Sequence, residues 1–211
     1  MNEFLDILRE RFDEDEPIMT EELIEAFSGV SRVTVFNWLS KAMEDGFVRK
    51  FRRGIYYLPR QSTVPGVGEL PLSSEKVIEK KYLRAKDIVY GYISGLNLEN
   101  EVHVSPQMPA TLEITTNKAS KRIQEIEPFG GYRKIALRKP RVEVTKDNVN
   151  ALRFLDLITY APLGFFNSLE NYNMTRFSKT VDRSTVINCL PYYPAKTAKR
   201  LLESEYFDVL A

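Results

Sequence analysis

The spacing of apolar residues over the first thirty positions predicts two amphipathic helices. The apolar positions of the first recur three and four residues apart and are Phe4, Leu5, Ile7 and Leu8. This helix is expected to end near the acidic run at residues 13–16, because Pro17 follows and breaks a helix. The second helix is expected to begin at Thr20 as its N-cap, without a full capping box, since the third residue after it is not a glutamate. Its apolar positions are Leu23, Ile24 and Phe27.

A third helix is predicted between Ser31 and Asp45. Ser31 is a favourable N-cap, because its hydroxyl accepts from the unpaired amides of the first turn. Gly46 is expected to end the helix, since glycine readily adopts the left-handed backbone conformation of a C-terminal turn. The apolar face, which we assign to the core, consists of Val35, Trp38, Leu39 and Ala42. The preceding turn at residues 28–30 has the length and the glycine of a helix-turn-helix.

The opposite face of this third helix carries polar side chains that point away from the predicted core. They are Arg32, Thr34, Asn37, Ser40 and Lys41. Arginine pairs bidentately with guanine and asparagine with adenine, so Arg32, Thr34 and Asn37 are the candidates for base contacts. Alternatively, Thr34 bonds within its own helix and Asn37 meets a phosphate. Phe36 fits either contact with a thymine methyl or packing beneath the following hairpin.

Two strand-like runs after the helix, residues 47–51 and 55–58, predict a β-hairpin. Its turn is Arg52-Arg53-Gly54. A helix-turn-helix followed by a basic hairpin is the outline of a winged helix-turn-helix. Residues 1–60 are therefore predicted to be a DNA-binding domain of this kind.

The sign of the charge reverses where the third helix begins. Residues 1–30 hold ten acids and two bases, residues 31–68 hold seven bases and two acids, and the whole chain has a net charge of only +1. Clustered cations neutralise phosphates and release counterions. The predicted DNA-binding residues are Ser31, Arg32, Thr34, Asn37, Lys41, Arg49, Lys50, Arg52 and Arg53. The alternative is that the basic hairpin is a solvated sheet edge, where cations discourage edge-to-edge pairing.

Composition and motifs disfavour an enzyme. Cys189 is the only cysteine and His103 the only histidine of the 211 residues, so thiolate zinc clusters and histidine dyads are excluded. We expect Cys189 to be an inert core or helix-face thiol, and His103 to be a hydrogen-bonded structural residue on a strand. No phosphate-binding glycine motif and no nucleophile–base pair occurs, so neither cofactor nor metal is expected. With no membrane-length apolar run and no secretory signal, we expect a cytoplasmic protein.

The second half predicts a mixed α+β domain with a helical tail. One helix is expected to begin at Ser73, another to cover residues 88–96, and a further one to follow Asp147 as its N-cap. Strands are expected at residues 102–104, 112–115, 133–137 and 142–144. The fold class is thus α+β. The predicted divisions are a winged helix-turn-helix at 1–60, a linker at 61–72, an α+β domain at 73–165 and a helical extension at 166–211.

A second basic stretch free of acids runs from residue 128 to residue 142. Its cations are Arg133, Lys134, Arg138, Lys139 and Arg141. It fits an additional DNA contact or a surface for an acidic partner, and it equally fits an exposed strand with solvated charges.

The order of motifs in the chain resembles the AbiE-type antitoxin and transcriptional regulator family, which is associated with type IV toxin–antitoxin systems. The motifs are GIYYLP, KYLRAKDIVYGYISGLNLEN, SPQMP, LEITTN, IALRKPRVEVT and DNVNALRFLDLI. The resemblance covers roughly residues 1–160. Residues shared with family members are Gly91 to Gly95, Gln107, Thr116, Asn117 and Asn148, whereas Val102-His103-Val104 stands where members commonly carry a glycine-leucine pair.

The resemblance implies an antitoxin that represses its own operon. Its winged helix would bind inverted repeats in the promoter as a monomer or weak dimer, and its second domain would be needed to neutralise a nucleotidyltransferase-like toxin. The alternative is a transcriptional regulator whose second domain senses a small molecule, with no toxin partner. A downstream nucleotidyltransferase gene would favour the antitoxin.

Overall fold

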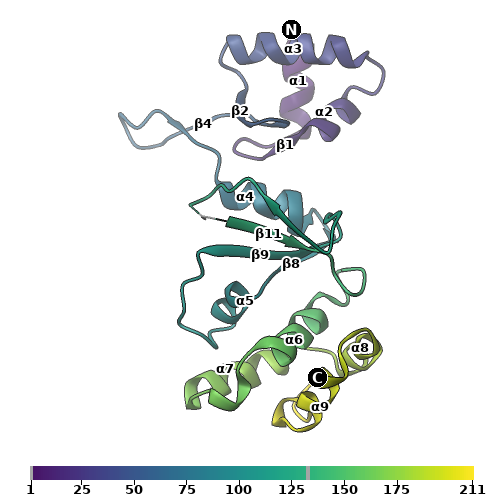
Figure 1. Ribbon diagram of the computed structural model, residues 1–211. Coiled ribbons are helices and arrows are strands. Elements are labelled where there is room, and N and C mark those ends of the chain that lie inside the picture. Colours follow the sequence, from purple (N-terminus) through teal and green to yellow (C-terminus); the bar gives the residue numbers. More distant parts are fainter. Residues whose placement is uncertain (1, 132–133) are drawn as a thin grey trace. The chain divides into compact units, whose positions relative to one another are not determined.

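The chain folds as two units, Met1–Ile78 and Glu79–Ala211. The computed structural model describes residues 2–131 and 134–211, and both units combine helices with strands, so the α+β class is confirmed (Figure 1). The boundary falls inside the helical segment that follows Ser73, and not in the predicted linker at residues 61–72. Within the described residues, every helix falls short of the length and apolar character that a membrane crossing requires.

The first unit contains the three predicted helices and a small antiparallel sheet. Its helices are α1 (Asn2–Arg11), α2 (Thr20–Ala26), α3 (Arg32–Glu44) and α4 (Ser74–Ile78). Its strands are β1 (Ile18–Met19), β2 (Arg49–Arg52), β3 (Ile55–Tyr57), β4 (Arg60–Gln61) and β5 (Glu69–Leu70). Strand β3 lies between β1 and β2, and an irregularity in the β2–β3 register falls between Lys50 and Arg52. The predicted hairpin is therefore present, with each strand one residue shorter than expected.

An aromatic cluster joins α1, α3 and the end of α2. The ring of Phe4 on α1 stacks on Phe27 with centroids 4.9 Å apart, and Trp38 on α3 contacts both rings edge-on or tilted. Trp38 is only partly buried, while Val35 on the same helix is fully buried. Aromatic pairs at these distances stabilise a core by about 0.5–1.5 kcal/mol each beyond burial. The predicted apolar stripe of α3 thus faces the core.

The ends of α3 follow the sequence prediction, but the start of α2 does not. The Ser31 hydroxyl accepts from the Thr34 amide at 3.2 Å, and Gly46 has a φ of +81°. Helix α2 is capped by Met19, whose amide donates to the Glu22 carboxylate at 3.0 Å. The prediction of Thr20 as the N-cap was wrong, because the Thr20 hydroxyl donates instead to the Gly54 carbonyl.

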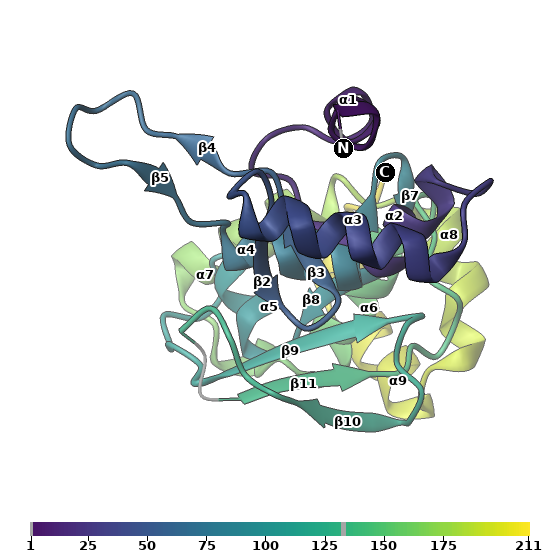
Figure 2. The same ribbon diagram turned by 90° about the horizontal axis from the view of Figure 1, so that it is seen from above.

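Residues 61–72 are not a simple linker. Strands β4 and β5 pair antiparallel, and the Ser62 amide donates to the Gly68 carbonyl at 2.8 Å. Figure 2 shows this ribbon projecting beyond the helices of its own unit. Proline and glycine in this segment form its turn rather than an extended connection.

The second unit is built on a four-stranded sheet in the order β10-β11-β9-β8, in which only the β11–β9 pair is parallel. Its strands are β6 (Arg84–Ala85), β7 (Ile88–Val89), β8 (Gly91–Ser94), β9 (Thr111–Thr116), β10 (Ile123–Ile126) and β11 (Lys134–Arg138). Its longer helices are α5 (Leu96–Glu101), α6 (Val149–Tyr160), α7 (Ser168–Ser178), α8 (Arg183–Cys189) and α9 (Ala195–Leu202). Four short helices, η1 (Glu79–Leu83), η2 (Leu163–Phe165), η3 (Leu190–Tyr192) and η4 (Glu205–Phe207), complete the described part.

Three local predictions in this unit were wrong. The helix expected through residues 88–96 is a pair of strands, β7 and β8, and the strands expected at 102–104 and 142–144 are turn and irregular backbone. The reason is tertiary at Gly91, where an added Cβ would lie 2.9 Å from the Thr115 carbonyl oxygen and closer still to that of Tyr82. Glycine lets β8 run between η1 and β9, a close approach that a helix would prevent.

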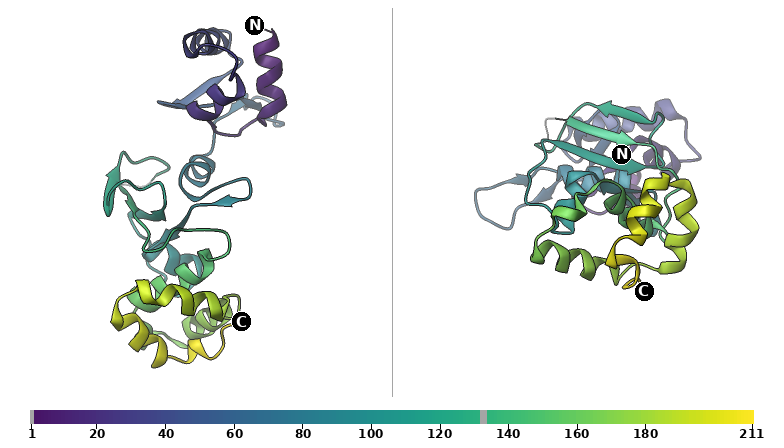
Figure 3. Two further views of the ribbon diagram at one scale, coloured as in Figure 1. Left: turned by 90° about the vertical axis from the view of Figure 1, so that its right-hand side faces the viewer. Right: turned by 60° about the horizontal axis from the view of Figure 1, so that its bottom comes forward.

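The C-terminal helices belong to the same core as α6 and are not a separate extension. Figure 3 shows α7, α8 and α9 gathered around α6. Phe154 and Ile158 of α6 are fully buried in one cluster with Met174 of α7 and Val186 of α8. The α6 helix begins after Asn148 rather than after an Asp147 cap. The predicted division at residue 166 therefore cuts through a hydrophobic core.

Candidate functional site

The outer face of α3 is exposed along its whole length. Arg32, Asn37 and Lys41 are exposed, and none of their side chains bonds to another described residue. Val33 on this face is 71% exposed. Since the opposite stripe of the same helix is buried, α3 presents free donors and acceptors to solvent on a supported scaffold. This matches the prediction that these three polar side chains point away from the core.

Thr34 and Phe36 have contacts within the first unit. The Thr34 hydroxyl lies 2.8 Å from the Ser31 hydroxyl, so both groups are engaged in the N-terminal cap of the helix. Phe36 is partly buried against the core of its unit. Ser31 is exposed, and its hydroxyl is already used by the cap.

The cations of the β2–β3 hairpin differ in their availability. Lys50 and Arg53 are exposed, and their side chains make no hydrogen bond or ion pair with a described residue. Arg49 is bound by the Glu69 carboxylate through two hydrogen bonds of 2.9 and 3.1 Å, which raise the pKa of its guanidinium. Arg52 is half-buried. In this structure Arg49 is thus paired with a carboxylate that lies beyond the acid-free segment, and its contact with DNA stays a prediction.

The tip of this hairpin is attached to the start of α2. Gly54 adopts a φ of +77°, and its carbonyl accepts from both the amide and the hydroxyl of Thr20, at 3.1 and 3.2 Å. These bonds hold the turn, which includes the neighbouring residue Arg53, beside the start of α2.

The second basic stretch is divided among several partners. Lys134 lies 3.8 Å from the Glu125 carboxylate, and Arg138 is bonded to Glu113 at 2.6 Å. Arg141 donates to the Tyr160 hydroxyl at 2.9 Å, while Lys139 is exposed without an ion pair in the described chain. Arg133 lies outside the described residues. Two cations of this stretch are thus paired with carboxylates, and a contact of the stretch with DNA or an acidic partner stays a prediction.

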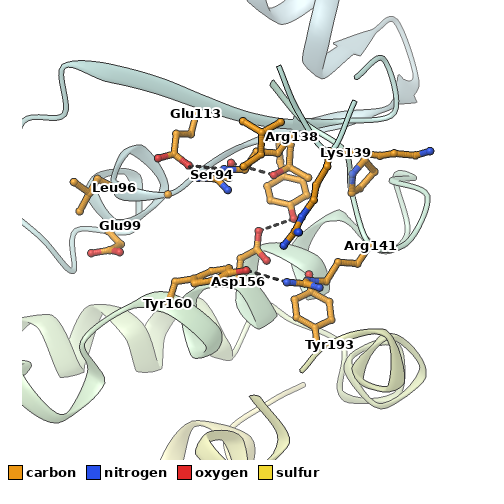
Figure 4. Close-up of a pocket in the computed structure, with 16 residues that line it drawn as sticks. Ser94, Leu96, Glu99, Glu113, Arg138, Lys139, Arg141, Asp156, Tyr160 and Tyr193 are labelled. Carbon is orange, nitrogen blue, oxygen red and sulfur yellow. Dashed lines mark hydrogen bonds and ion pairs between the residues drawn. The ribbon is translucent and has the colours of Figure 1, made fainter. Parts of the chain in front are cut away.

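Three of these cations, Arg138, Lys139 and Arg141, line a cavity of about 540 Å³ within the second unit (Figure 4). Strands β8, β9 and β11, the start of α5 and the end of α6 contribute its walls. The volume lies in the range of small-molecule sites. Sequence reasoning did not predict this cavity.

Asp156 lies on the floor of this cavity. Its carboxylate accepts from the Tyr92 hydroxyl at 2.8 Å. Burial raises the pKa of Asp156 to about 6, against the opposing effects of the Tyr92 hydrogen bond and the Arg141 charge. Burial likewise raises the pKa of Tyr92 well above its ordinary value. An acid among the apolar residues of VNALRFLDLITY was the sequence signal that could have identified this position.

The remaining candidate groups make no further site. His103 is exposed in a turn with a φ of +60°, so its predicted place on a strand was wrong. Cys189 is buried, as expected, and burial raises the pKa of its thiol. Among residues 2–131 and 134–211, no group of three or more His, Cys, Asp or Glu side chains is arranged to hold a metal ion.

Comparison with known proteins does not assign this chain to a family. No protein-family model matches it, and no curated protein matches it significantly.

Proposed function

We propose that the first unit is a winged helix-turn-helix that binds duplex DNA. In this proposal α2 and α3 form the helix-turn-helix, and the β2–β3 hairpin is the wing. The order α1, β1, α2, α3, β2, β3 and the sheet order β1-β3-β2 support it. So does the placement of the Thr20–Gly54 bonds, which tie the wing to the helix pair.

The observation that carries the proposal is the outer face of α3. A helix whose inner stripe is buried and whose outer Arg32, Asn37 and Lys41 lack partners in the described chain is suited to the major groove. Arg32 and Asn37 read base edges, since their side chains bond guanine and adenine bidentately. Lys41, Lys50 and Arg53 contact phosphates.

We further propose that the protein is an antitoxin that represses its own promoter in the cytoplasm. This part rests on the resemblance of residues 1–160 to the AbiE-type family. The second unit would neutralise a nucleotidyltransferase-like toxin, and the first would bind inverted repeats as a monomer or weak dimer.

Two experiments test the two parts separately. Footprinting on the region upstream of the gene, with sizing of the complex, should reveal two protected half-sites; an unprotected region at low salt would refute operator binding. Co-expression should rescue cells from a toxin encoded by the neighbouring gene. Continued growth arrest, with the protein folded and abundant, would refute the antitoxin role.

A ligand-responsive regulator is the second candidate function. The 540 Å³ cavity supports it, because it brings acids, bases and tyrosines of the second unit together. Co-expression separates the candidates, since a sensor without a toxin partner would give no rescue.

A further inference from the structure

A buried carboxyl without a protein partner lines the cavity of the second unit. Glu99 is only 8% exposed, and its carboxyl makes no hydrogen bond or ion pair with any described residue. Burial raises the pKa of this carboxyl. The carboxyl oxygens are not sealed inside the protein, so a cation or donor that enters the cavity can reach them, and their partial desolvation favours such a partner. The end of the cavity at α5 is therefore suited to bind a positively charged group.

Two cations without carboxylate partners line another part of the cavity. Arg141 donates to the Tyr160 hydroxyl, and its guanidinium lies 5.3 Å from the ring centroid of Tyr193. Neither Arg141 nor Lys139 forms an ion pair within the described chain. Figure 4 shows Glu99 on the opposite side of the cavity from Arg141, whereas the exposed Lys139 side chain extends away from the cavity. The end of the cavity at Arg141 is therefore suited to bind an anion.

Arg122 also lines the cavity and forms no ion pair within the described chain, whereas Arg138, Glu113 and Asp156 are engaged. Arg138 and Glu113 neutralise one another through a 2.6 Å hydrogen bond, and Asp156 accepts from Tyr92. Leu96 is 37% exposed and lines the same cavity near Glu99. An uncharged, partly apolar ligand segment fits this middle part.

We propose that the cavity binds a small zwitterion, with its ammonium group at Glu99, its carboxylate at Arg141, and an aliphatic segment between them. A simple anion would leave Glu99 unpaired, and a simple amine would leave Arg141 unpaired. A nucleic-acid strand is disfavoured, because its phosphates would meet the Glu99 carboxylate. The inference concerns the second unit alone and does not depend on DNA binding.

Calorimetric titration of the full-length protein with ω-amino acids of increasing length tests the proposal. The probes are glycine, β-alanine, γ-aminobutyrate and ε-aminocaproate, with caproate and hexylamine as singly charged analogues. We expect one chain length to bind best, about tenfold or more tighter than either analogue, since each end adds a charge-assisted hydrogen bond. A zwitterion series that binds no tighter than the analogues would overturn the proposal.

Charge-removing variants assign the two ends. Glu99→Gln should weaken the best zwitterion about tenfold or more and leave caproate binding unchanged, whereas Arg141→Gln should weaken the zwitterion and leave hexylamine binding unchanged. Glu203→Gln, at the exposed C-cap of α9, is the matched control and should change none of these affinities. Circular dichroism verifies that each variant is folded. Equal zwitterion affinity in Glu99→Gln and the wild type would also overturn the proposal.

Discussion

Single substitutions in the β2–β3 hairpin should distinguish a cation that is free to bind phosphate from one that is already paired. The Arg53 side chain is exposed without a partner in the described chain, whereas Arg49 is held by the two hydrogen bonds that it donates to the Glu69 carboxylate. If the hairpin is a wing, Arg53→Ala should lower the salt dependence of DNA binding. Arg49→Ala should leave that dependence almost unchanged.

The magnitude follows from counterion release. Each phosphate contact contributes about 0.9 to the slope of log affinity against log salt concentration. Loss of the Arg53 contact should flatten the slope by about 0.9, which makes the decline in affinity between about 50 and about 200 mM salt about 3.5-fold smaller. Glu69→Gln should act in the opposite direction, because it releases the Arg49 guanidinium; the slope should steepen by up to about 0.9.

The assay is a fluorescence-anisotropy titration of a duplex from the gene's upstream region over a series of salt concentrations. Lys179→Ala, an exposed charge change at the end of α7, is the control for net charge. Equal flattening by Arg49→Ala and Arg53→Ala would refute the role assigned to Glu69. An unchanged slope in Arg53→Ala would refute a phosphate contact by the wing.

Three further predictions concern stability, each measured by chemical denaturation. Because burial raises the pKa of Asp156 from 3.8 to about 6, the folded state holds this proton more tightly than the unfolded state. Its contribution to stability is present near pH 4 and is lost as the pH rises through about 6, by at most about 3 kcal/mol, and Asp156→Asn should remove that dependence. Gly91→Ala should cost about 3 kcal/mol or more, because its Cβ would meet backbone carbonyls of η1 and β9, whereas Gly29→Ala, with open space around it, should stay within about 0.5 kcal/mol. Ser31→Ala should cost about 1 kcal/mol through loss of the α3 cap, and an unchanged unfolding free energy would contradict that role.

The helix predictions in the first unit succeeded where the signal was local. The three-and-four spacing in α3 places Val35, Leu39 and Ala42 on one buried face whatever surrounds the helix. In the second unit the same reasoning failed at residues 88–96, because the apolar spacing fitted a helix while the sheet register required strands. Short apolar runs carry no information about which neighbour will cover them.

The sequence alone determined both ends of α3, the amphipathic faces of the first unit and the placement of cations around residues 49–53, since these depend on residues a few positions apart. Tertiary structure decided which charges remain available. Glu69 reaches Arg49 across 20 positions, and Tyr92 meets Asp156 across 64 positions. Such pairs form only when separate strands and helices are brought together, and no periodicity along the chain encodes that approach. For the same reason the cavity that joins Glu99 to Arg141 became visible only in the folded protein.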